Sequence, residues 1–163
     1  MSPVPQYRDL DEFYTFAGEL LTSPQVLSMR RYIQHGSISC LEHCVAVAWY
    51  SFLLYRRLGL HGQERALIRG ALLHDFFLYD WHLPGHPRLH GFFHPGLAAQ
   101  NAVQYFELSD LELEIILRHM WPLTLIPPRH LTAVIVSLVD KYCTLCEVTG
   151  RRYPSFLLWQ PQK

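Results

Sequence analysis

Histidine and aspartate residues carry the most suggestive chemistry in this sequence. His74 and Asp75 are adjacent and follow an apolar segment. On a helix, neighbouring side chains point about 100° apart, so the two could reach one metal ion, or two ions, from different directions. An adjacent His-Asp pair alone is far more often a polar helix end than a metal site. The pair therefore needs support from elsewhere in the chain.

His43 and Asp140 supply that support because both lie in apolar surroundings. Leu41 and Val45 flank His43, and Asp140 follows the apolar run 134–139. Burying an ionised carboxylate without a partner is very costly, and the usual solutions are an arginine, a set of hydrogen-bond donors or a metal ion. Lys141, the nearest basic residue in sequence, points in a different direction on a helix. Asp140 is thus a candidate metal ligand.

The order of these residues resembles the HD-domain superfamily of metal-dependent phosphohydrolases. A histidine comes first, a His-Asp pair follows about thirty residues later, and an aspartate lies in the last long helix. The resemblance covers roughly residues 30–148, preceded by N-terminal helices in 1–29 and followed by a tail in 149–163. It implies an all-α bundle of about six to seven helices. It also implies a first metal held by four residues: His43, His74, Asp75 and Asp140.

His94 and His119 extend the resemblance to the six-ligand pattern of binuclear HD proteins. In that pattern Asp75 would bridge the two ions, and His94 and His119 would hold the second. His90 competes with His94, because four histidines recur at four-residue steps: His82, His86, His90 and His94. The intervening prolines and glycines argue against a helix there. His94 is preferred because Pro95 marks a helix start, which leaves His90 beside the substrate or behind a ligand.

The resemblance implies hydrolysis of a phosphate ester. Two divalent ions would bring four positive charges, of which Asp75 and Asp140 cancel two, so the site would attract anions. The ions would lower the pKa of a bound water and give a hydroxide that attacks phosphorus. The expected ions are one or two of Fe, Mn, Co, Ni or Zn. The predicted catalytic residues are Asp75, His90 and Lys141, and Asp80 is a further candidate for the leaving-group acid.

Substrate contacts are predicted from basic residues near the ligands. Arg30, Arg31 and His35 precede the first ligand helix, and Arg118 is adjacent to His119. Each could hold a phosphate group, although a solvated helix end explains them equally well or better. Several aromatic residues could stack a ring, although core packing is their commoner use: Phe76, Phe77, Tyr79, Trp81, Phe92, Phe93 and Trp121.

Two other functions are consistent with the same residues. The six-ligand pattern also resembles HD-type di-iron oxygenases, which would need bound iron and consume O₂. A non-catalytic module that binds a nucleotide or a partner is the other alternative. All six ligand positions are filled, which argues against a degenerate, non-catalytic site.

Helix signals dominate the elements that must position these residues. Ser39 with Glu42, and Ser109 with Glu112, have the spacing of capping boxes. Apolar periodicity and Gly or Pro breaks then predict helices over 10–21, from Pro24 to about residue 34, and over 39–58, 63–77, 95–106, 109–119 and 130–148. The stretch 80–94 contains two prolines and two glycines and is predicted to be a long loop over the site.

Composition sets the remaining expectations. The chain of 163 residues is half apolar and is expected to form one domain over 1–163. Lys plus Arg and Asp plus Glu both total 14, so no net charge favours nucleic acid duplexes or anionic membranes. A cytoplasmic protein with a small phosphorylated substrate is expected, and homodimerisation stays open. The four cysteines, spaced as pairs on helices, are expected to be reduced and buried.

Overall fold

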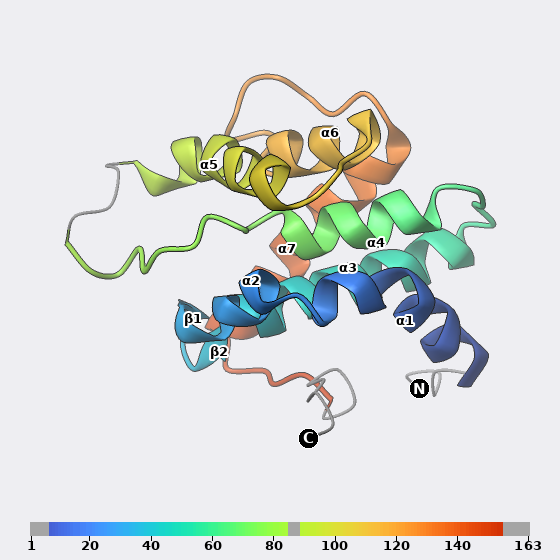
Figure 1. Ribbon diagram of the computed structural model, residues 1–163, viewed down its shortest axis with the longest axis horizontal. Coiled ribbons are helices and arrows are strands. Elements are labelled where there is room, and N and C mark those ends of the chain that lie inside the picture. The colour runs from blue at the N-terminus through green and yellow to red at the C-terminus, as the bar shows by residue number, and fades with distance from the viewer. Residues whose placement is uncertain (1–6, 85–88, 155–163) are drawn as a thin grey trace.

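The computed structural model describes residues 7–84 and 89–154. Within them the chain forms seven α helices, one 3-10 helix (η1) and a two-stranded antiparallel ribbon (Figure 1). This confirms the predicted all-α class. The elements in chain order are α1 (Tyr7–Leu21), α2 (Pro24–Leu27), η1 (Ser28–Arg31), β1 (Ile33–His35), β2 (Ile38–Ser39), α3 (Cys40–Arg57), α4 (Glu64–Leu73), α5 (His90–Tyr105), α6 (Asp110–Arg118) and α7 (Leu131–Val148).

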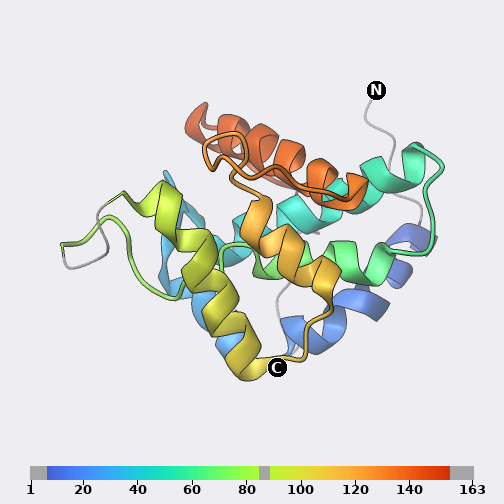
Figure 2. The same cartoon turned by 90° about the horizontal axis from the view of Figure 1, so that it is seen from above.

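Helices α3 and α4 form the centre of the molecule. Helix α3 packs against α4 and α7, and α4 packs against α1 and α6. Helices α5 and α6 lie together on the far side of α4 from α1, and α7 runs beside α3 (Figures 1 and 2). Buried side chains from these helices, such as Phe13, Trp49 and Leu72, form a continuous apolar core. Helices α3, α5, α6 and α7 all contact α4, and His74 and Asp75 directly follow its last residue.

Both predicted capping boxes are present. The Ser39 side chain accepts from the backbone N–H of Glu42, and the Glu42 carboxylate accepts from the backbone N–H of Ser39. Ser109 and Glu112 repeat this exchange at the start of α6. Each box satisfies backbone donors that a helix start leaves without partners, which explains why the starts of α3 and α6 were predictable from sequence.

Helix α5 begins earlier than its sequence suggests. The predicted start at Pro95 is wrong, because the helix already begins at His90 and Pro95 lies inside it. Pro95 removes the hydrogen bond that an N–H at this position would have made to the Gly91 carbonyl, and the packing of α5 against α6 offsets this cost. The helical segment 90–94 consequently places His90 and His94 one turn apart, and the predicted loop is shorter than expected.

The segment before α3 also differs from the prediction. A second helix was expected to extend to about residue 34, but α2 ends at Leu27 and η1 ends at Arg31. The chain then forms the ribbon of β1 and β2, which turns at Gly36 with a φ of 59° that favours glycine. Helix α4 likewise ends at Leu73, and residues 74–77 form a turn rather than a further helical turn.

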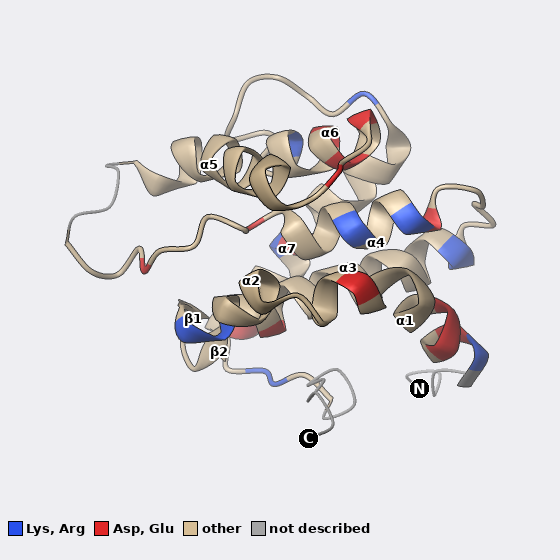
Figure 3. Ribbon diagram, in the orientation of Figure 1, with Lys and Arg blue, Asp and Glu red and all other residues tan. Residues whose placement is uncertain are grey.

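The charged residues and the cysteines occupy different parts of the fold. Figure 3 marks positions of charged residues on α1, α4 and α6, whereas α5 carries no Lys, Arg, Asp or Glu. All four cysteines are buried and free, as predicted: Cys40, Cys44, Cys143 and Cys146. Among the helices of the described residues, none combines the length and apolar character needed to cross a bilayer.

Candidate metal centre

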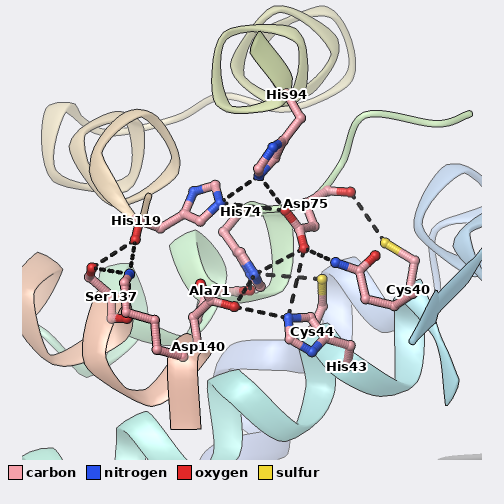
Figure 4. A network of polar contacts seen from close by, with 12 residues as sticks. Cys40, His43, Cys44, Ala71, His74, Asp75, His94, His119, Ser137 and Asp140 are labelled. Carbon is pink, nitrogen blue, oxygen red and sulfur yellow. Dashed lines mark hydrogen bonds and ion pairs between the residues drawn. The ribbon is translucent and has the colours of Figure 1, made fainter. Parts of the chain in front are cut away.

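Six predicted ligands from five segments of the chain converge on one buried site (Figure 4). They are His43 from α3, His74 and Asp75 from the turn after α4, His94 from α5, His119 immediately after α6 and Asp140 from α7. Each of the six is at most 6% exposed. The packing of the helices therefore brings together ligands that are far apart in sequence: His43 and Asp140, 97 positions apart, are in contact.

Asp75 divides the site into two halves. Its Oδ2 lies 3.3 Å from His74 Nε2 and 3.7 Å from His43 Nε2. Its Oδ1 lies 3.1 Å from His94 Nε2 and 3.5 Å from His119 Nε2. One carboxylate oxygen thus serves each half, as a bridging ligand requires. We call the His43 side the first half and the His94 side the second half.

Asp140 belongs to the first half. Its Oδ1 lies 3.1 Å from His43 Nε2 and 3.6 Å from His74 Nε2. Ligand atoms held about 2.1 Å from one metal ion lie roughly 3.0 to 3.4 Å apart in octahedral or tetrahedral geometry. The separations in both halves fall close to this range. The donor atoms are therefore spaced as they would be around metal ions.

The hydrogen bonds of the histidine rings leave the metal-facing nitrogens free. His74 Nδ1 donates to the carbonyl of Ala71 (2.7 Å), and His94 Nδ1 donates to that of His90 (3.0 Å). His119 Nδ1 donates to the carbonyl of Ile116 (2.8 Å). A neutral ring that donates from Nδ1 carries its lone pair on Nε2, and this outer bond fixes the tautomer and the orientation of a metal-binding imidazole.

Two observations indicate that the protein groups alone do not complete this site. The Nε2 atoms of His94 and His119 are only 2.8 Å apart, although the tautomers above give each a lone pair. In addition, His74 Nε2 and Asp75 Oδ1 are buried without a hydrogen-bond partner among the described residues. Facing lone pairs repel and buried unpaired polar atoms are costly, and a cation between them removes both problems. The donor set therefore fits one or two divalent metal ions.

The charges at the site lead to the same conclusion. Asp75, Asp140 and Glu147 are buried together, and within residues 7–84 and 89–154 no arginine or lysine forms an ion pair with any of them. Burial alone would raise the pKa of Asp75 and Asp140, but neighbouring histidines outweigh it and lower the pKa of both carboxyls. Both are therefore ionised and in need of positive charge.

The histidines respond to the same groups in opposite directions. Burial would lower the pKa of His43, yet its hydrogen bonds to Asp140 and Glu147 raise it to about 10. Burial, together with His74 and His94, lowers the pKa of His119 to about 3. His119 is therefore neutral with a free lone pair, whereas His43 attracts a positive charge, which a proton or a metal ion can supply.

Three further residues support the ligands, and sequence reasoning did not predict these roles. Glu147 Oε1 accepts from His43 Nδ1 (2.7 Å), and Gln34 Nε2 donates to Asp75 Oδ2 (2.6 Å). Ser137 Oγ donates to the carbonyl of His119 (2.7 Å). Glu147 had a detectable signal, because it lies seven residues after Asp140 on one helix and an acid in the last turn opposes the helix dipole. Gln34 had none, since the ribbon that carries it was not expected.

Lys141 and His90, both predicted to be catalytic, form hydrogen bonds with other protein groups. Lys141 Nζ donates to the His119 carbonyl (2.8 Å) and to the carbonyl and hydroxyl of Ser137 (3.1 and 3.0 Å), which uses all three of its donors. His90 Nδ1 is hydrogen-bonded to the Tyr79 hydroxyl (2.7 Å), and its ring stacks on His94 with centroids 4.6 Å apart. Their roles as acids stay predictions.

The remaining predicted site residues lie farther from the ligands or on the surface. His35 is half-buried, with its ring 6.2 Å from that of His43. Arg30 and Arg31 are exposed on η1, and Arg118 lines a surface pocket. Asp80 Oδ1 accepts from the backbone N–H of His82 (2.9 Å). The substrate-binding roles of His35 and the arginines, and the role of Asp80 as an acid, stay predictions.

The aromatic residues near the site divide into three groups. Phe76 and Phe77 belong to the core, Phe92 and Phe93 are about half exposed, and Trp81 stacks on His90 with centroids 5.3 Å apart. The Tyr79 ring contacts those of Phe77 and His90. Trp121 is 36% exposed. Only Trp81, Tyr79 and Phe77 therefore contact rings beside the second half.

Comparison with known proteins adds no relative. No protein-family model matches the chain, and no curated protein or solved structure matches it either. What the molecule itself provides is an all-helical fold with buried His and Asp groups that could hold a metal ion.

Proposed function

We propose that this protein is a metal-dependent phosphohydrolase of the HD-domain type with two metal positions. The observation that carries the proposal is the division of the site by Asp75, whose two oxygens face two different pairs of histidines. A structural metal site needs only one closed set of ligands, whereas two metal positions that share a carboxylate suit an in-line displacement at phosphorus, in which bound ions would stabilise the attacking and the leaving oxygens.

The ligand set supports an anionic substrate. Bound divalent ions would supply positive charge for phosphoryl oxygens and would lower the pKa of water toward neutrality. Asp75, Asp140 and Glu147 would cancel three of the four positive charges that two ions bring, so the first and second halves together would retain one net positive charge and an attraction for anions. Phosphoryl transfer depends mainly on such charge and on positioning, and needs no separate nucleophilic side chain.

The protein groups would orient the reacting centre. Gln34 fixes the bridging carboxylate through its bond to Asp75 Oδ2, and Lys141 with Ser137 fixes the carbonyl of His119. The first contact holds a ligand oxygen directly, and the second holds the backbone of a ligand residue. Preorganisation of this kind lowers the cost of reaching the transition state, because the site does not rearrange during the reaction.

The test combines metal analysis with activity. We expect about two metal equivalents in the wild-type protein and near zero in Asp75→Ala, since this change removes a ligand from both halves. The wild type should hydrolyse para-nitrophenyl phosphate with Mn²⁺ or Co²⁺ in the absence of O₂, and Asp75→Ala should lose at least about a hundredfold in kcat/KM.

Two results would redirect this proposal. Consumption of O₂ by the iron-loaded protein, without anaerobic hydrolysis, would replace it with the di-iron oxygenase alternative. Failure of the wild type to bind any metal after reloading would leave a non-catalytic helical module.

A further inference from the structure

Glu147 is the third carboxylate of the site and is not one of the six predicted ligands. It lies in the last turn of α7, two helical turns beyond Asp140, and its side chain is fully buried. Its Oε1 accepts from His43 Nδ1 at 2.7 Å. The other three ligand histidines donate from Nδ1 to backbone carbonyls instead. His43 is thus the one ligand histidine among the described residues that is oriented by a charged group.

A second contact holds Glu147 in place. The hydroxyl of Tyr153, which follows α7 in the chain, donates to Glu147 Oε1. Burial and the neighbouring Cys143 and Glu147 raise the pKa of Tyr153, so its hydroxyl stays protonated and can only donate to the carboxylate. The ring of Tyr153 also packs on that of Tyr50 from α3, with centroids 6.3 Å apart. Tyr153 therefore joins α3 to the end of α7 behind the first half.

These contacts make the two halves electrostatically unequal. The first half has Asp140, its share of Asp75, and Glu147 behind His43. The second half has its share of Asp75 and two histidines that are backed by neutral carbonyls. A carboxylate behind a ligand histidine increases the electron density on the metal-facing nitrogen and strengthens binding, so negative charge favours a cation in the first half.

We propose that Glu147, locked by Tyr153, is the positioning residue that makes the first half the tighter metal position, so that the first half fills before the second. This inference rests on the proposed function, because it requires that the site binds metal. Four ligands in the first half against three in the second already favour this order, and the inference adds the residue outside the ligand set that enlarges the difference in affinity.

The experiment is a Co²⁺ titration followed by calorimetry and by the visible absorption of bound Co²⁺. The wild type should show two steps of unequal affinity. Glu147→Gln keeps the size of the side chain and an oxygen that can accept from His43 but removes the negative charge. We expect its tighter step to weaken by about 10- to 100-fold, with the weaker step unchanged. Tyr153→Phe should weaken the tighter step by several-fold.

The controls separate this role from a merely structural one. Glu114→Gln alters a carboxylate of α6 that bonds to His130 and lies outside the metal site, so it should leave both Co²⁺ steps unchanged. The unfolding midpoint of metal-free Glu147→Gln should fall only modestly, because the amide oxygen can still accept from His43 Nδ1 and His43 keeps Asp140 as a charged partner.

The outcomes are distinguishable. Equal Co²⁺ affinities in wild type, Glu147→Gln and Tyr153→Phe would overturn the role of Glu147 and leave the proposed function standing. Absence of Co²⁺ binding by the wild type would overturn both. A markedly lower unfolding midpoint for Glu147→Gln with an unchanged Co²⁺ spectrum would make Glu147 a structural residue only.

Discussion

The protein buries two clusters of ionised groups, and they are completed in different ways. In the first cluster Arg69 Nε donates to Glu112 Oε1 (2.6 Å), and its remaining nitrogens donate to Glu19 (2.8 Å) and to the carbonyl of Glu107 (3.1 Å). Glu112 Oε2 in turn accepts from Ser109. Every charge has a partner supplied by the chain, and the cluster joins α4 to α6 and α1.

The metal centre has the opposite character. Its carboxylates meet histidines and a glutamine but no arginine or lysine among the described residues, and buried donor and acceptor atoms are left unpaired. Arg69 and Glu112 are as well buried as the metal ligands, so burial alone does not distinguish a structural site from a functional one. The difference is that an arginine of the chain balances the carboxylates of the first cluster, whereas no arginine or lysine among the described residues does so at the metal centre. Substitutions in the two clusters should therefore change stability and metal binding differently.

The largest loss of stability is expected from Glu112→Ala. This change leaves Arg69, which is 1% exposed, without its buried partner, and it also removes the capping box of α6. Breaking one side of a buried ion pair costs about 3 to 5 kcal/mol. Urea unfolding would measure this as a lower midpoint at an unchanged slope. A loss below about 1 kcal/mol would mean that the pair contributes little.

A comparable effect of opposite sign is expected from adding metal. Co²⁺ at about a thousand times its Kd should raise the free energy of unfolding by about 4 kcal/mol, because only the folded chain brings the ligands together. Asp75→Asn should lose this gain. In the presence of EDTA, however, the variant should lose only a small part of this stability, because the histidines that lower the pKa of Asp75 replace a metal ion only in part. Marked destabilisation of metal-free Asp75→Asn would contradict the comparison.

Lys141→Met should affect the metal centre more than the fold. It removes the ammonium group that holds the His119 carbonyl and Ser137, so the second half should bind Co²⁺ about tenfold more weakly. Arg57→Met, on an exposed position of α3, is the matched control. If the control weakens Co²⁺ binding equally, the effect comes from net charge rather than from the contact with His119.

Ser109→Ala should weaken the structural cluster by about 1 kcal/mol, the usual contribution of an N-cap. The Ser109 hydroxyl contacts Glu112 Oε2, which belongs to the same carboxylate that holds Arg69. Its effect should therefore not add to that of Glu112→Ala in a double-mutant cycle, and Co²⁺ binding should not change. Strict additivity would indicate that the cap and the ion pair act independently.

The smallest effect concerns pH and the partly buried Glu114. Burial raises the pKa of this carboxyl, but the backbone N–H groups of His130 and Arg129 and the His130 side chain together outweigh burial and lower the pKa below 4.5. A lowered folded-state pKa stabilises the protein above the unfolded-state value, and this contribution is lost as pH falls through the folded-state pKa. Glu114→Gln should therefore slightly reduce the acid sensitivity of unfolding below about pH 4.5; an identical pH dependence would exclude this contribution.

Much of this arrangement could be predicted from the sequence. The starts of α3 and α6 follow from two capping boxes, and α7 follows from a long apolar run that ends at Gly150. The six residues predicted as ligands do converge, because each is a polar residue that is buried beside apolar neighbours. Local signals of this kind are strong wherever side-chain chemistry and helix periodicity agree.

The rest depended on contacts that a sequence does not display. Helix α5 includes His90 although Pro95 favours a later start, since its packing against α6 outweighs the local penalty. The ribbon that carries Gln34 has only five strand residues and pairs within a short turn, which gives no periodicity to detect. Glu147 was not identified because its partners, His43 and Tyr153, are assigned only once α3 and α7 pack together.

The depth of the ligand set also governs how fast ions would exchange. With every ligand at most 6% exposed, an ion cannot leave by simple diffusion from an open groove. Release would require part of the surrounding structure to open, which occurs on the timescale of local unfolding. The residence time of a bound ion would then be set by the rate at which the protein opens, so ion exchange should slow in variants or conditions that stabilise the fold.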